Sequence, residues 1–394
     1  MTEFDMTAKT FKGLEEVLAT ELIQLGANNV QIQRRAVSFS GDKTLLYKAN
    51  IHLRTASRIL KPILVFEAPN ADAVYDKLKN YQWENHMNVN TTFAIDSTVF
   101  SEDFKHSKYL TYRVKDAIVD YFSEKHDKRP SVRIDNPQLI FNIHVSHHTC
   151  TLSLDSSGES LHKRGYKKAN TEAPINEALA AGMILLSGWE GKSDFIDPMC
   201  GSGTILIEAG LIALNIPPGI YRKEFAFEKW KDFDEELFNK IYNDDSNERI
   251  FNYKIYGSDI SPKAVGIAVE NISNAGLSKY IEVKIQSVQQ LESPSKNCLM
   301  ITNPPYGERI KPSDLYAIYS SLGKTLKHKF IGNSAWIISS DENALFKIGL
   351  KPSTKIPLLN GALDCLFCKY DIFPGKRNDF LAKRSFQNDK KKEY

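Results

Sequence analysis

Apolar and polar positions follow the periods of helices and strands along most of the chain. Up to residue 155 the two periods are mixed, with helical spacing at Gly13–Leu25, 71–79 and 109–125. Alternation with a period of two predicts strands at 30–33, 36–39, 62–66, 92–99, 140–145 and 149–154. This order predicts an α+β region, and the turn-forming sequence Asp155-Ser-Ser-Gly158 predicts a linker after it.

The second half of the chain alternates between short apolar strands and helices. The segment that starts at Asp194 is predicted to run from a strand through a glycine loop into a helix, and a strand at 255–260 leads into a second helix that ends at Gly276. Ser261 is expected to cap that second helix, with Pro262 in its first position. Further strands at 280–285 and 298–302 continue the order, which predicts an α/β domain with a mostly parallel sheet.

Composition limits the protein class. The chain of 394 residues is 42% apolar, enough for two or three packed units. A net charge of +3 and a pI near 8.3 are mildly basic, so affinity for nucleic acid has to come from local patches. No leading segment resembles a signal peptide, and the longest apolar run, Ala178–Leu186, is too short to cross a membrane. Five cysteines fit a reducing cytoplasm, and Cys365 and Cys368 lack the second pair that a metal site needs, so no metal is expected.

The tetrapeptide Asn303-Pro304-Pro305-Tyr306 follows the apolar run 298–302 and is typical of enzymes that methylate a planar nitrogen. The lone pair of such a nitrogen is delocalised, so the nitrogen is a poor nucleophile. The oxygens of the Asn303 side chain and the Pro304 backbone can accept its two N–H hydrogens. Pro304 and Pro305 restrict the backbone, and Tyr306 offers a face for stacking. The alternative is a strand that ends in an ordinary proline-rich loop.

A glycine loop upstream has the features of a cofactor site. Gly201 and Gly203 let backbone approach a ligand, and the helix behind them presents unpaired N–H groups. Thr and Ile follow Gly203 and a third spaced glycine is absent, which excludes a Walker loop and a dinucleotide fingerprint. A ligand with a carboxylate and no phosphate fits better, and S-adenosylmethionine is such a ligand. The expected contacts are Asp197, Pro198, Cys200, Gly201, Ser202, Gly203 and Thr204.

Asp259 stands at the carboxyl end of the strand that follows this loop, with Ile260 after it. At that end of an open α/β sheet, an acidic residue can accept hydrogen bonds from both ribose hydroxyls of a nucleoside ligand. A lone Asp before a helix is more often a cap. Its place between the glycine loop and the tetrapeptide favours the ribose, so we expect Asp259 and Ile260 to contact the cofactor.

With Leu363-Asp364-Cys365 near the end, this order of elements resembles the bacterial 23S rRNA guanine-N2-methyltransferases that carry an N-terminal THUMP RNA-binding module. The resemblance covers nearly the whole chain and is closest to the N-terminal methyltransferase half of the large bifunctional rRNA enzyme. Matching stretches are 13–16, 21–22, 25–27, 54–60, 114–120, 161–166, 173–175 and 303–309. The glycine loop and the tetrapeptide are shared with adenine and glutamine methyltransferases, so the N-terminal stretches are what point to RNA and guanine.

The resemblance implies a ferredoxin-like subdomain at 1–60, a THUMP domain at 61–160 and a methyltransferase domain at 161–385, with a basic, disordered tail at 386–394. The methyltransferase sheet is expected to be the seven-stranded, mostly parallel, class I (Rossmann-like) type. The second domain that makes 7-methylguanosine in fused relatives is not expected, because the chain stops soon after Phe380. Where relatives usually place an acidic contact to the cofactor's adenine, this chain has Ser287, so weaker cofactor affinity is expected.

Two basic clusters are candidates for RNA contact. Between 105 and 133, eight Lys or Arg face four acids, and 162–168 contains basic residues and no acid. A solvated helix face and a charged linker are the alternatives. The expected RNA contacts are Arg113, Lys115, Lys163, Arg164, Tyr166, Lys167 and Lys168.

The resulting hypothesis is S-adenosylmethionine-dependent N2-methylation of a guanine in 23S rRNA, by direct in-line transfer to a flipped base, carried out by a cytoplasmic monomer. A tRNA guanine-N2-methyltransferase has nearly the same architecture and stays open. A DNA adenine-N6-methyltransferase would normally carry a target-recognition domain instead of this N-terminal module. A non-catalytic rRNA-binding assembly factor is the remaining alternative, and the intact Gly201, Asp259 and Asn303 argue against it.

Overall fold

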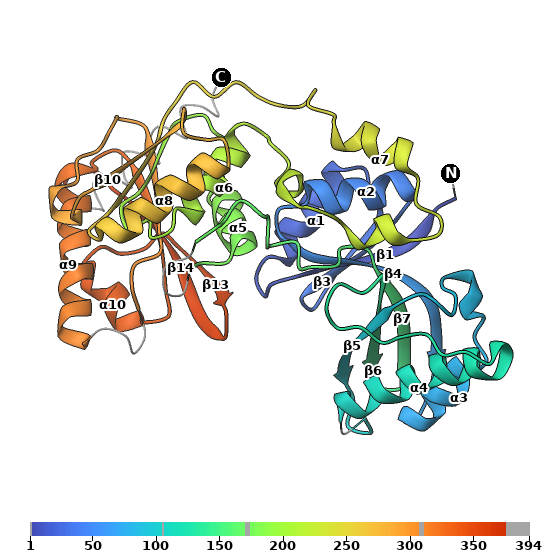
Figure 1. Cartoon of the computed structure of the whole chain (residues 1–394). Helices are drawn as coiled ribbons and strands as arrows, with labels where there is room; N and C mark the ends of the chain where they lie inside the picture. The colour runs from blue at the N-terminus through green and yellow to red at the C-terminus, as the bar shows by residue number, and fades with distance from the viewer. Residues whose placement is uncertain (1, 105, 170–173, 307–310, 376–394) are drawn as a thin grey trace, which may run out of the picture. The chain divides into compact units, whose positions relative to one another are not determined.

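The computed structural model describes residues 2–104, 106–169, 174–306 and 311–375, which form two compact units (Figure 1). The N-terminal unit comprises Met1–Phe11, Leu18–Arg164 and Pro217–Asp244, and the C-terminal unit comprises Lys12–Val17, Gly165–Ile216 and Asp245–Tyr394. The two units are therefore interleaved along the sequence. The predicted tail and parts of two matching stretches, 173 and 307–309, lie outside the described residues. Among the described residues, none of the helices combines the length and the apolar character that crossing a membrane requires.

The N-terminal unit is built on a seven-stranded sheet with the order β2-β3-β1-β4-β7-β6-β5, whose neighbours are antiparallel except for β5 and β6. Its strands are β1 (Phe4–Thr10), β2 (Asn28–Gln33), β3 (Ala36–Gly41), β4 (Ala56–Glu67), β5 (Phe93–Phe100), β6 (Leu139–Ser146) and β7 (Thr149–Asp155). Its helices are α1 (Glu15–Gln24), α2 (Lys43–His52), α3 (Ala71–Lys79), α4 (Ser107–His126) and α7 (Glu235–Tyr242), with short 3-10 turns η1 (Trp83–Asn85), η2 (Pro218–Tyr221) and η3 (Ala226–Lys229). The predicted α+β character of this region is confirmed.

Aromatic packing and one arginine fix the segment Pro217–Asp244 to the N-terminal unit. Phe227 stacks on Tyr47 of α2 with ring centroids 4.5 Å apart. The Arg222 guanidinium donates hydrogen bonds at 2.7–3.1 Å to four backbone carbonyls that follow β7, those of Ser157, Glu159, Ser160 and Lys163. A segment that follows the first strand and helix of the methyltransferase sheet in sequence thus completes the core of the other unit.

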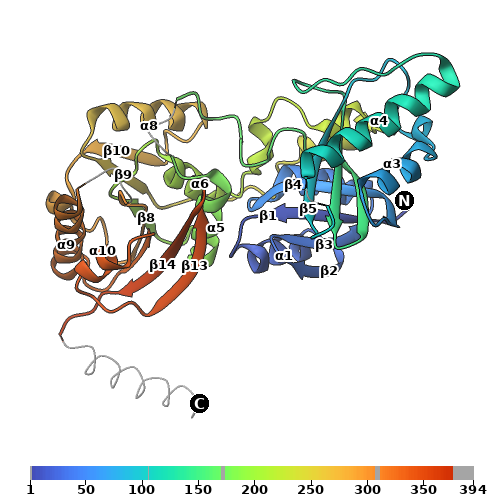
Figure 2. The same cartoon turned by 90° about the horizontal axis from the view of Figure 1, so that it is seen from below.

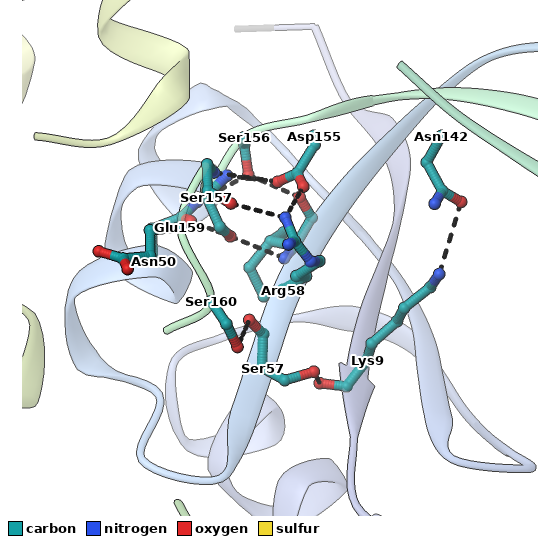
Figure 3. Close-up of polar contacts among 12 residues, drawn as sticks. Lys9, Asn50, Ser57, Arg58, Asn142, Asp155, Ser156, Ser157, Glu159 and Ser160 are labelled. Carbon is teal, nitrogen blue, oxygen red and sulfur yellow. Dashed lines mark hydrogen bonds and ion pairs between the residues drawn. The ribbon is translucent and has the colours of Figure 1, made fainter. Parts of the chain in front are cut away.

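The residues predicted to be a linker after β7 are buried instead. Asp155 and Ser157 are at most 1% exposed. Asp155 accepts a hydrogen bond from Arg58 of β4, and Ser157 donates to Asn50 of α2 at 2.7 Å (Figure 3). The segment bends at 156–159, but its side chains form hydrogen bonds with Asn50, Arg58 and Ile59 inside the unit, which fixes the segment.

The C-terminal unit has a seven-stranded sheet with the order β10-β9-β8-β11-β12-β14-β13, parallel except for β14, which is antiparallel to both neighbours. Its strands are β8 (Asp194–Asp197), β9 (Ile255–Asp259), β10 (Ile281–Ile285), β11 (Cys298–Thr302), β12 (Ser334–Ser339), β13 (Thr354–Asn360) and β14 (Leu363–Asp371). Its helices are α5 (Glu177–Ser187), α6 (Thr204–Ala213), α8 (Pro262–Asn274), α9 (Pro312–Lys329) and α10 (Glu342–Lys347), with the 3-10 turn η4 (Val288–Gln290). Helices α5, α6 and α8 lie on one side of the sheet, and α9 and α10 on the other (Figure 2). The predicted mostly parallel seven-stranded sheet is confirmed.

The strand order places a switch point beside β8. From β8 the chain moves outward through β9 and β10 on one side and then returns to β11 and β12 on the other. In open α/β sheets, ligands bind outside the carboxyl ends of the strands at such a point. The glycine loop after β8, Asp259 at the end of β9 and the tetrapeptide after β11 all lie at this edge.

Candidate active site

The glycine loop connects β8 to α6 in a tight turn whose backbone conformation would strain most residues other than glycine. Gly201 and Gly203 have φ values of 52° and 81°, in the left-handed region that glycine adopts without cost. The Gly203 N–H donates to the Cys200 carbonyl at 2.8 Å, and the Cys200 N–H donates to the Ser258 carbonyl of β9 at 2.9 Å. Gly203 caps α6 without a side chain, so the first N–H groups of this helix have no capping side chain. The loop leads directly into the uncapped first turn of α6, whose N–H groups are of the kind that binds a carboxylate.

Asp259 lies directly beside this loop. Its carboxylate accepts hydrogen bonds from the Gly201 N–H at 3.0 Å and from the Ser261 N–H at 2.9 Å. Ile260, the next residue, is 75% exposed and offers apolar surface at the same strand end. The structure thus brings the predicted ribose acceptor and the glycine loop together, although they are far apart in sequence.

Ser287 follows β10 at the same edge of the sheet. The N–H of its neighbour Gln286 donates to the Asp259 carbonyl at 3.1 Å, and the Ser287 hydroxyl donates to Gln290 at 3.3 Å. Its position beside Asp259 fits the predicted contact to an adenine ring.

Asp197 is a buried residue at the end of β8 that links the glycine loop to the end of β11. Its side chain is 1% exposed and accepts hydrogen bonds from the Thr302 hydroxyl at 2.7 Å and from the Met199 N–H at 3.2 Å. Burial raises the pKa of Asp197 to about 7, against the effect of the Thr302 hydrogen bond. Predicted as a cofactor contact, Asp197 is placed where it fixes the end of β8 to the end of β11. Pro198, Cys200, Ser202 and Thr204 form the loop that it supports, and Cys200, Ser202 and Thr204 are buried.

The tetrapeptide after β11 carries an acceptor without a donor. Within the described part of the chain, the Asn303 Oδ1 is buried and makes no hydrogen bond. The Pro305 carbonyl, in contrast, accepts from the Tyr319 hydroxyl of α9 at 3.3 Å. Leaving a buried acceptor unpaired costs about 1–3 kcal/mol, so this oxygen can take a donor that the described residues do not supply.

Tyr306 is half-buried, and its hydroxyl is anchored. The Asn360 Nδ2 donates to the Tyr306 hydroxyl at 2.5 Å. Burial raises the pKa of Tyr306 well above its usual range, so the phenol stays neutral at physiological pH. Tyr306 can therefore offer a ring face and an O–H group, but no phenolate base.

The predicted RNA contacts at 163–168 divide into buried and exposed side chains. Arg164 is 2% exposed and donates to the Leu161 carbonyl at 2.8 Å. Tyr166 is also buried and donates to Glu208 at 3.0 Å. Lys167 forms an ion pair with Glu177 at 2.9 Å, with both side chains about a tenth exposed. Arg164, Tyr166 and Lys167 thus have structural partners inside the fold. Lys163 and Lys168 are exposed, and Lys163 pairs with Glu159 at 2.7 Å.

Arg113 and Lys115 of α4 are also paired. The Arg113 Nε lies 2.7 Å from an oxygen of Asp72, and its guanidinium lies over the Tyr75 ring at 4.0 Å from the centroid. Lys115 pairs with the adjacent Asp116 at 2.9 Å. A contact from these residues to RNA would compete with their acidic partners.

Asn271 of α8 was missed by sequence reasoning. It is fully buried, donates to the carbonyls of Ala169 and Ser202 at 3.1 Å, and accepts from the Lys168 N–H at 3.1 Å. It therefore ties the glycine loop to the segment that carries the second basic cluster. The available signal was an Asn on the apolar face of a helix, next to Ile272.

Comparison with known proteins assigns three regions of the chain. A family model for an RMKL-like methyltransferase domain matches residues 164–369, one for an RlmL ferredoxin-like domain matches 5–60, and one for a THUMP domain matches 68–155. A Synechocystis protein provisionally named an RNA methyltransferase is 35% identical over 93% of this chain and 96% of its own length. The ribosomal RNA large subunit methyltransferase K/L of Psychromonas ingrahamii is 36% identical over 93% of this chain. The chain spans about half the length of that relative, 50%.

The solved structures agree with this assignment. The crystal structure of SMU.472, provisionally assigned as a methyltransferase and complexed with SAH, superposes with a TM-score of 0.85 at 30% identity. It covers 95% of this chain and 100% of its own. The resemblance and the fold expected from the sequence are confirmed by these matches.

Proposed function

The chain belongs to the family of RMKL-like methyltransferases, and we propose that it methylates the N2 amine of a guanine in 23S ribosomal RNA. The chain spans only about half the length of the K/L relatives, so an rRNA substrate is proposed for it by similarity to them. The observation that supports it is the buried Oδ1 of Asn303, which follows β11, the neighbour of β8, and has no hydrogen-bond partner among the described residues, so it can accept from an exocyclic amine.

The methyl donor is S-adenosylmethionine, and the residues present fit it. When bound, it supplies an electrophilic methyl group on a sulfonium, so the reaction needs no metal and no acid catalyst. The N-terminus of α6, which has no capping side chain among the described residues, suits its carboxylate, and Asp259 suits its ribose hydroxyls. We propose that Ile260 and Ser287, which lie at the ends of the neighbouring strands β9 and β10, contact its adenine.

The tetrapeptide then acts on the target base. A guanine turned out of its stack, at a cost of about a few kcal/mol, places its amine against the Asn303 Oδ1 and the Pro304 carbonyl, and its ring against Tyr306. Both oxygens stabilise the positive charge that develops on nitrogen during in-line attack. The protonated product loses its proton to water, which is consistent with a Tyr306 hydroxyl that stays neutral.

RNA binding is assigned to the THUMP-containing N-terminal region, with Lys163 and Lys168 as the exposed contacts of the second basic cluster. We expect the protein to act in the cytoplasm as a monomer.

Nucleoside mapping of a strain that lacks the gene tests this function. We expect one N2-methylguanosine to disappear from 23S rRNA, and purified protein with labelled S-adenosylmethionine to restore it on that RNA. Loss of the same nucleoside from tRNA, with 23S rRNA unchanged, would refute the rRNA assignment and favour a tRNA enzyme. Loss of N6-methyladenine from DNA would refute both.

A further inference from the structure

The tip of the β13–β14 hairpin reaches the tyrosine of the tetrapeptide. Asn360 is the last residue of β13 and pairs with Leu363 across a turn that contains Gly361, whose φ is 62°. The Asn360 Nδ2 lies 2.5 Å from the Tyr306 hydroxyl, and the Cys365 Sγ of β14 lies 3.9 Å from the same oxygen. The hairpin therefore holds the end of the ring that points away from the backbone.

This hairpin is itself fixed near its tip. Lys12 pairs with Asp364 at 2.9 Å. A Cβ at Gly13 would lie 2.6 Å from the Pro357 carbonyl, and Gly13 has a φ of 90°, so only glycine lets this segment lie so close to β13. The sequence Leu363-Asp364-Cys365, which resembles the family pattern, thus lies where a fixed turn meets Tyr306.

We propose that Asn360 is a positioning residue, which orients the Tyr306 ring for stacking on the target base through the hydrogen bond to its hydroxyl. This inference rests on the proposed function. The two prolines restrict the backbone that leads to Tyr306, but the tyrosine side chain can still rotate about its own bonds. The amide of Asn360 removes that freedom before the base arrives, so the stacking surface is preorganised and less ordering is needed on binding.

Kinetics of four variants test the proposal: Asn360→Ala, Asn360→Asp, Tyr306→Phe and the double variant Asn360→Ala/Tyr306→Phe. Asn360→Ala and Tyr306→Phe each remove the same hydrogen bond and keep the ring. We expect each to lower kcat/KM for RNA about tenfold, while KM for S-adenosylmethionine stays unchanged. In the double variant we expect no further loss, because the bond can be lost only once. In Asn360→Asp the hydrogen bond can form in the opposite direction, with the phenol O–H donating to the carboxylate, so this variant should retain most of the activity.

Lys355→Ala, exposed on the same strand, is the matched control and should match the wild type. Losses that multiply in the double variant, an unchanged Asn360→Ala, or an equal loss in Asn360→Asp would each overturn the positioning role. If Asn360→Ala proves unstable in thermal melting, Asn360→Asp and Tyr306→Phe still decide, since the first should be active and the second impaired. A wild-type protein that methylates no RNA would overturn the proposed function and this inference together, whereas an active wild type with an unaffected Asn360→Ala overturns only the inference.

Discussion

Replacing Asn303 by Ala should separate activity from stability. The Oδ1 of Asn303 is buried and, within the described residues, has no donor, so it carries an uncompensated cost of about 1–3 kcal/mol in the free protein. Asn303 is only partly buried as a whole, so the packing lost on truncation is small. We therefore expect the free energy of unfolding to stay the same or to rise by about 1 kcal/mol.

The catalytic activity of Asn303→Ala should fall, although its stability should not. An acceptor that stabilises charge in the transition state is worth about 2.7–4 kcal/mol, or a factor of about 10²–10³ in kcat, by analogy with single oxyanion-hole groups. Methyl transfer from tritiated S-adenosylmethionine to 23S rRNA measures the rate, and urea denaturation measures the stability. RNA binding and cofactor binding should remain near wild type.

Thr302→Val is the matched control, one residue earlier on the same strand. It removes the hydroxyl that donates to the buried Asp197 at 2.7 Å, so it should lower the free energy of unfolding by about 1–3 kcal/mol. An Asn303→Ala variant that is as destabilised as Thr302→Val, or one that keeps wild-type kcat, would refute the role assigned to the unpaired oxygen.

Three further changes test other parts of the structure. Asp259→Asn should weaken S-adenosylmethionine binding about tenfold in calorimetry, because it removes charge from the acceptor beside the glycine loop, and an unchanged affinity would contradict the ribose assignment. Asp197 keeps its proton up to about pH 7 in the folded protein, whereas the unfolded chain releases it near pH ~4, so the free energy of unfolding should fall as pH rises through this window. In Asp197→Asn the free energy of unfolding should change less with pH, and above pH 7 it should exceed the wild-type value by at most about 4 kcal/mol. Urea titrations at pH 5 and pH 8 measure both values. The same pH dependence in both proteins would contradict the assigned protonation of Asp197. Arg222→Ala removes four hydrogen bonds to backbone carbonyls and should destabilise the N-terminal unit by about 2–4 kcal/mol, with partial recovery in Arg222→Lys. Equal stability of the Ala and Lys variants would contradict a stabilising role of these hydrogen bonds.

The parts of the fold that the sequence predicts well are those set by local periodicity. The helix expected at 71–79 coincides with α3, and the one expected at 109–125 lies inside α4. The strand expected to begin at Asp194 is β8, and the apolar run 298–302 coincides with β11. Parallel strands end at one edge of a sheet, so residues that follow such strands could be grouped into one site before any coordinates were known.

Partners that come from distant segments could not be predicted in the same way. Charge and residue type suggested that Arg164 faces RNA, but its donors turn to backbone carbonyls inside the unit. Similarly, the segment Pro217–Asp244 belongs to the N-terminal unit through contacts such as the stacking of Phe227 on Tyr47, two residues that are far apart in sequence. Burial of a polar group depends on which carbonyls or carboxylates happen to surround it, and periodicity carries no information about that.

The polar groups of the site differ in whether the protein itself satisfies them. Asp259 is held by two backbone N–H groups and Asp197 by the Thr302 hydroxyl, so the groups around the cofactor position are oriented before any ligand binds. Such preorganisation lowers the ordering cost of binding and the reorganisation cost of reaction. The Asn303 Oδ1 is the exception, because its hydrogen bond is missing among the described residues. A donor that arrives with the substrate would form this hydrogen bond without displacing a partner among the described residues. The missing hydrogen bond thus lies at the atom where the target amine is proposed to bind.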